Sequence, residues 1–168
     1  IAIALSTRPS ILVADEPTTM LDVTLQAQIL DLLNDLKRKL GLTLVFITHN
    51  LGIAATICDK VLVIYAGSMV EYGPVDEVLT SPLHPYTKKL LECVPRASAK
   101  AGKLKYIPGS LPDLRNPPFG CIFAPRCSEA MDICMKMSPP VVEVKPSHAV
   151  ACHRYSAQLG DGKSPCWT

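Results

Sequence analysis

The feature that most constrains this chain is a short apolar run near its start, because such a run suits a strand buried on both faces. Residues 11–14 read Ile-Leu-Val-Ala, and leucines and isoleucine then recur at helical spacing over residues 25–40. Gly41 stands where a helix would end, and residues 43–47 predict a second strand. Strand, helix and strand in succession imply a right-handed crossover. We therefore expect an α/β fold.

The alternation of strand and helix patterns continues to about residue 94. The expected elements are, in order, a helix at 51–57, a strand at 61–65, a turn at 66–68 into a strand at 69–72, a short helix at 75–79 and a helix from Pro85 to about Val94. We take residues 1–94 as one part of the chain.

After Pro95 the composition changes. Most of the 15 prolines and most of the seven cysteines lie there, and regular periodicity fades. We expect a Pro-rich linker at 95–120, a Cys-rich, irregular extension at 121–155 and a tail at 156–168. Such a segment is not expected to form a conventional core.

Composition excludes several classes of protein. A net charge of +2 does not argue for binding to nucleic acid, and no apolar run approaches the ~18 residues that a membrane span needs. The chain opens on Ile1 without the basic region of a signal peptide, which we interpret as the tail of a helix whose beginning is absent. With an odd number of cysteines and no secretion signal, a reducing compartment and a metal site fit better than a disulfide framework.

Two adjacent carboxylates, Asp15 and Glu16, follow directly on the first apolar run. Ligands of open parallel sheets bind at the carboxyl ends of strands, where loops and helix N-termini converge. Two carboxylates there suit nucleotide hydrolysis: one can hold Mg²⁺ through water, and the other can orient or deprotonate the attacking water. The alternative is that the pair only begins a loop and caps the next helix.

The surrounding residues favour the first interpretation. Residues 11–22 read Ile-Leu-Val-Ala-Asp-Glu-Pro-Thr-Thr-Met-Leu-Asp, and residues 46–49 read Phe-Ile-Thr-His. In order and spacing they resemble the Walker B motif, the D-loop and the switch histidine of ABC-type ATPases. The resemblance implies a partial P-loop NTPase, a parallel sheet with flanking helices, that hydrolyses ATP with Mg²⁺.

Roles for individual residues follow from the same resemblance. Asp15 would position Mg²⁺, and Glu16 would be the general base on the attacking water. His49 would sense the γ-phosphate. Asp22 would reach across a dimer interface toward the partner's nucleotide. Asn50 stands where the family usually has Asp, and we expect this difference to have a modest effect.

Two motifs of the family are missing from the chain. It contains no Gly-x-x-x-x-Gly-Lys-Ser/Thr loop to hold the phosphates and no Leu-Ser-Gly-Gly signature. We interpret the chain as a C-terminal fragment that begins just after the signature, and we expect no ATPase activity from this polypeptide alone.

Four cysteines form the second candidate site. Cys121, Cys127, Cys134 and Cys152 lie in the Pro-rich segment, at a spacing unlike common zinc modules or bacterial ferredoxins. Four thiolates suffice for Zn²⁺ or an iron–sulfur cluster, and the alternative is structural thiols or disulfides. His148 and His153 flank Cys152 and are alternative ligands.

A narrower resemblance concerns the same region. Residues 83–87 read Leu-His-Pro-Tyr-Thr, and residues 107–112, 116–118 and 125–127 read Ile-Pro-Gly-Ser-Leu-Pro, Asn-Pro-Pro and Pro-Arg-Cys. These segments are similar to the C-terminal extension of ABC importer ATPases for oligopeptides, dipeptides or nickel. In members with all four cysteines the extension binds a [4Fe-4S] cluster, so the resemblance implies a cluster, as a structural clamp or a redox sensor, with Zn²⁺ as the alternative.

The resemblance also implies partners. The intact protein would dimerise with a second ABC ATPase subunit at the cytoplasmic face of the membrane, power permease subunits, and serve a separate substrate-binding protein. It implies no nucleic acid. Two rival classes remain: a non-transport ABC ATPase, and a non-catalytic regulatory fragment that binds metal.

Overall fold

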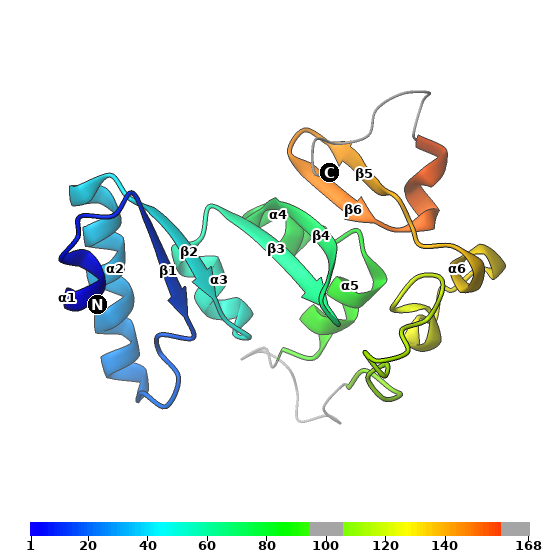
Figure 1. Cartoon of the computed structure of the whole chain (residues 1–168), viewed down its shortest axis with the longest axis horizontal. Coiled ribbons are helices and arrows are strands. Elements are labelled where there is room, and N and C mark those ends of the chain that lie inside the picture. The colour runs from blue at the N-terminus through cyan, green and yellow to red at the C-terminus, as the bar shows by residue number, and fades with distance from the viewer. Residues whose placement is uncertain (95–105, 159–168) are drawn as a thin grey trace. The chain divides into compact units, whose positions relative to one another are not determined.

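The computed structural model describes residues 1–94 and 106–158, so residues 95–105 of the expected linker and 159–168 of the expected tail lie outside the described residues (Figure 1). The chain divides into two compact units, Ile1–Cys58 and Asp59–Thr168.

The first unit is built around a parallel strand pair. Its elements are α1 (Ala2–Leu5), β1 (Ile11–Asp15), α2 (Val23–Leu40), β2 (Thr43–Ile47) and α3 (Leu51–Ile57). β1 and β2 pair in parallel, with Asp15 opposite Ile47, as the strand–helix–strand pattern predicts. α2 ends at Gly41, whose φ of 63° is the left-handed conformation of a helix C-cap.

One face of this strand pair is covered and the other is open. Leu12, Leu33, Leu42, Ile53 and Ile57 form the buried core. The alternate residues Ile11, Val13, Val45 and Ile47 are between 44% and 61% exposed. Parallel strands are normally covered on both faces, so this open apolar face is unusual for a finished sheet.

The second unit contains a four-stranded antiparallel sheet. Its elements are β3 (Lys60–Tyr65), β4 (Ser68–Pro74), α4 (Val75–Thr80), α5 (Pro85–Glu92), the 3₁₀ helix η1 (Ala124–Arg126), α6 (Asp132–Lys136), β5 (Val141–Lys145), β6 (His148–Ala151) and the 3₁₀ helix η2 (His153–Gln158). The strand order is β3-β4-β6-β5. The β3–β4 hairpin and the helices α4 and α5 lie where the sequence predicts them.

The expectation that the Cys-rich segment forms no conventional core is wrong. β6 pairs with β4, placing Val150 opposite Glu71. Phe123, Val142 and Val150 are at most 1% exposed. The β5–β6 hairpin extends the β3–β4 sheet, and Phe123 supplies an aromatic core residue. The compact unit accordingly begins at Asp59, whereas the composition changes near residue 95.

Gly120 permits a close approach of two backbone segments. The Cys121 N–H donates to the Cys134 carbonyl at 2.7 Å. A Cβ on Gly120 would lie 2.1 Å from that same carbonyl oxygen. Only a residue without a side chain fits there.

We predict that Gly120→Ala destabilises the chain by about 1–3 kcal/mol, because the added methyl group meets backbone atoms that cannot rotate away. Urea unfolding followed by circular dichroism measures the change. Ser128→Ala, an exposed position in the same segment, is the matched control. Equal midpoints for the two variants would contradict the packing described.

Candidate functional site

The ends of β1 and β2 bring Glu16 and His49 together. The Glu16 N–H donates to the Ile47 carbonyl at 2.9 Å, which continues the parallel pairing one residue beyond Asp15. His49 follows β2, and its Nδ1 lies 2.9 Å from Glu16 Oε1. Asp15 is the exposed last residue of β1. Parallel register thus places a carboxylate pair and an imidazole at one edge, as expected for ligand-binding strand ends.

Glu16 is held in a defined position. Thr19 Oγ1 donates to its Oε2 at 2.9 Å, so each carboxylate oxygen has a partner. Its φ of 43° is positive, which is costly for a residue with a side chain and is typical of functional sites. The hydrogen bonds to His49 and then to Thr19 lower the pKa of Glu16 below its usual value. The carboxylate is therefore ionised at neutral pH, yet it remains exposed to solvent.

Asp22 and Asn50 each cap a helix, a structural role separate from the roles that the family resemblance implies. Asp22 caps α2, its Oδ1 accepting the N–H groups of Thr24 at 3.0 Å and Leu25 at 2.9 Å. Asn50 caps α3 in the same way, with the N–H of Gly52 at 2.9 Å. Asn and Asp are equally good N-caps. The cap signature, a polar residue before an apolar helical run, was present in the sequence.

The four candidate cysteines lie in one region of the second unit, and none forms a disulfide. Burial raises the pKa of the Cys121, Cys127 and Cys152 thiols, and the neighbouring thiols of the set raise it further. Within residues 1–94 and 106–158, however, no three His, Cys, Asp or Glu side chains are arranged to hold a metal ion. The thiols are near one another without forming a ligand cage.

The two histidines near Cys152 have other partners. Both ring nitrogens of His148 face glutamate oxygens. His153 Nε2 lies 2.8 Å from the Met137 carbonyl oxygen. These contacts favour the four cysteines over the histidines as candidate ligands.

The His-Pro-Tyr motif anchors α5. His84 is the N-cap, and its Nδ1 accepts the Tyr86 N–H at 3.0 Å. The Tyr86 ring packs against those of Tyr65 and Phe123, with centroids 4.7 and 5.3 Å apart. Burial lowers the pKa of His84 to about 4, so its ring is neutral at physiological pH and can accept this hydrogen bond.

A cavity of about 510 Å³ lies over the sheet of the second unit. Side chains of β3, β4 and β5 line it together with His84 and Cys121. Among the residues that the structure describes, those lining the cavity include no Lys or Arg. In the part of the chain that the structure covers, no helix has both the length and the hydropathy to cross a membrane.

We predict that stability falls as the pH drops from about 6.5 toward 4, because the unfolded chain binds a proton on His84 before the folded chain does. The contribution is at most roughly 3 kcal/mol. His84→Asn keeps a capping oxygen but does not titrate. Urea unfolding at several pH values should therefore show that the free energy of unfolding falls less steeply with decreasing pH in the variant than in the wild type. Parallel curves for the two proteins would contradict the neutral, buried His84.

Comparison with known proteins identifies part of the second unit. Residues 70–134 match the family model described as "Oligopeptide/dipeptide transporter, C-terminal region". This range contains the His-Pro-Tyr motif and three of the four candidate cysteines.

Similarity to individual proteins extends over nearly the whole chain. The oligopeptide transport ATP-binding protein OppD of Salmonella typhimurium is 50% identical over 159 residues, which is 95% of this chain and 47% of that protein. OppD of Escherichia coli is 51% identical with the same coverage. The dipeptide transport ATP-binding protein DppD of Caldanaerobacter subterraneus is 47% identical over 92% of this chain and 48% of that protein.

The chain spans about half the length of the curated relatives it matches. Both the first unit, with Glu16 and His49, and most of the second lie within the similar region. The chain is therefore similar to the ATP-binding proteins of oligopeptide and dipeptide transport over almost all of its length, and its residues 70–134 match the model of the C-terminal region of such transporters.

Proposed function

We propose that the chain is the C-terminal half of an ATP-hydrolysing subunit that powers a peptide importer. The observation that carries the proposal is the Glu16–His49 pair at the ends of two parallel strands, 2.9 Å apart. The names of the relatives supply the peptide and the transport function. Permease subunits in the membrane are then the partners, and the cytoplasmic face is the location.

Each site residue has a role in this proposal. Glu16, ionised and held by His49 and Thr19, orients and deprotonates the attacking water. His49 lies beside Glu16 at the same strand ends and is suited to contact the γ-phosphate. Asp15 would hold Mg²⁺, which compensates phosphate charge during hydrolysis. Preorganisation of this kind suits phosphoryl transfer, which depends on placement and charge compensation more than on covalent chemistry.

Asp22 has an oxygen available for the proposed dimer contact. Its Oδ1 accepts both N–H groups of the α2 cap. The side chain is exposed, so its second oxygen can meet a group of a second ATPase subunit without loss of the cap.

The remainder of the nucleotide site would come from another part of a longer protein. No Gly-x-x-x-x-Gly-Lys-Ser/Thr loop is present in the chain. The open apolar face at Ile11, Val13, Val45 and Ile47 is suited to covering by further elements. The similarity to transport proteins favours this proposal over the two rivals, a non-transport ATPase and a regulatory fragment.

We predict that Glu16→Gln in the longer protein lowers kcat for ATP hydrolysis at least about a hundredfold, because the general base is lost. ATP affinity should stay nearly unchanged, measured by calorimetry. Asp35→Asn, on the exposed surface of α2, is the control. The 168-residue chain alone should show no turnover. If the chain alone hydrolyses ATP and Glu16→Gln abolishes that activity, the proposal that the rest of the nucleotide site lies outside this chain is refuted.

We also propose that Cys121, Cys127, Cys134 and Cys152 hold a [4Fe-4S] cluster, with Zn²⁺ as the alternative. Support comes from the free thiols of all four cysteines and from the backbone hydrogen bond that brings Cys121 and Cys134 together. Binding would require the thiols to lose their protons and turn toward a common centre.

Anaerobic purification followed by iron and sulfide analysis tests the cluster. We predict about four irons and four sulfides per chain, the content of one such cluster, and their loss in Cys134→Ser. Cys93→Ser, a cysteine outside the set, should keep the metal. Zinc without iron would refute the cluster, and no metal at all would refute the metal site.

A further inference from the structure

A fully buried carboxylate, Glu71 of β4, joins two distant parts of the second unit. Both Glu71 and His148 are 0% exposed. Glu71 accepts the backbone N–H groups of Leu83 at 2.8 Å and His84 at 3.0 Å. His148 Nε2 lies 2.8 Å from Glu71 Oε1. One carboxylate thus holds the loop before α5 and a side chain of β6.

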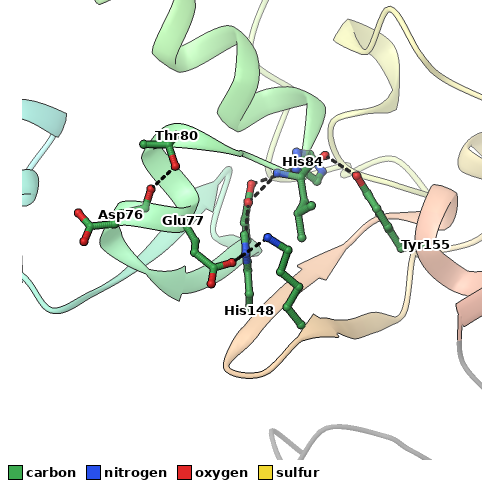
Figure 2. A network of polar contacts seen from close by, with 9 residues as sticks. Asp76, Glu77, Thr80, His84, His148 and Tyr155 are labelled. Atoms are coloured by element: carbon green, nitrogen blue, oxygen red, sulfur yellow. Dashed lines mark hydrogen bonds and ion pairs between the residues drawn. The ribbon is translucent and has the colours of Figure 1, made fainter.

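His148 lies between two glutamates, Glu71 and Glu77; Figure 2 labels His148 and Glu77 in this network. Its Nδ1 lies 3.2 Å from Glu77 Oε2, and Lys145 Nζ lies 3.1 Å from that same oxygen. The hydrogen bonds from Lys145 and then from His148 lower the pKa of Glu77. The imidazole ring of His148 therefore bridges two carboxylates, the buried one of Glu71 on β4 and that of Glu77 on α4.

The backbone contact that these side chains reinforce is short. β4 and β6 are paired only at Glu71–Val150 and Tyr72–Ala149. Gly73 makes room for the imidazole, since a Cβ there would lie 2.9 Å from His148 Cδ2. Removing one partner of a buried hydrogen-bonded pair costs more than removing both, because the remaining polar group is left buried without its partner.

We propose that Glu71 and His148 form a latch that holds the β5–β6 hairpin in register on β4 and thereby positions Cys152, the residue after β6. The inference rests on buried side chains and hydrogen bonds of this chain. It holds whether or not the proposed ATPase function or metal site is correct.

Hydrogen–deuterium exchange of the 168-residue chain tests the latch. Glu71→Gln and His148→Gln should each raise the exchange rate of residues 148–151 at least about tenfold. The double variant should raise it by less than the product of the two single effects, because the two side chains are in direct contact and their effects are coupled. Asp76→Asn, the exposed neighbour of Glu77 on α4, is the control and should match the wild type.

The compact first unit is an internal reference. If a single variant also loses protection in β1 and β2, recovery of that protection in the double variant supports the latch. Failure to recover contradicts it. Single variants that exchange like Asp76→Asn, or a double variant equal to the product of the singles, would likewise overturn the proposal.

Discussion

The parallel pairing of β1 with β2 is the interaction on which the proposed site depends. With Asp15 opposite Ile47, the next residue of the first strand hydrogen-bonds to the end of the second. Glu16 and His49 are 33 residues apart in sequence, and this register brings them within 2.9 Å. A slip of one residue would turn every side chain of a strand to the other face. The geometry of the carboxylate and the imidazole is therefore a property of the strand register.

In the second unit a Pro-rich segment forms a core by joining an existing sheet. The strands β5 and β6 extend the β3–β4 hairpin at the edge formed by β4. The His-Pro-Tyr motif joins this core through Tyr86, while Glu71 holds the loop that precedes it. The motif is thus an anchor between the helix α5 and the extension.

Much of the first unit was predictable because its residues follow simple periodicities. Residues 11–14 and 43–47 are uninterrupted apolar runs, and Gly41 marks a helix end. The β5–β6 hairpin was not predicted, because its short strands lie among prolines and its pairing partner is distant. The contact between Glu71 and His148 spans 77 residues. No local pattern reveals a buried pair of this kind. The helix cap that Asn50 forms does follow a local pattern, a polar residue before an apolar helical run.

The central claim is that Glu16 and His49 form the hydrolytic side of a nucleotide site. A structure of the longer protein with ATP and Mg²⁺, carrying Glu16→Gln to prevent turnover, tests it most directly. The account predicts that residue 16 lies beside a water in line with the γ-phosphate and that His49 contacts that phosphate. Nucleotide bound away from the ends of β1 and β2 would contradict it.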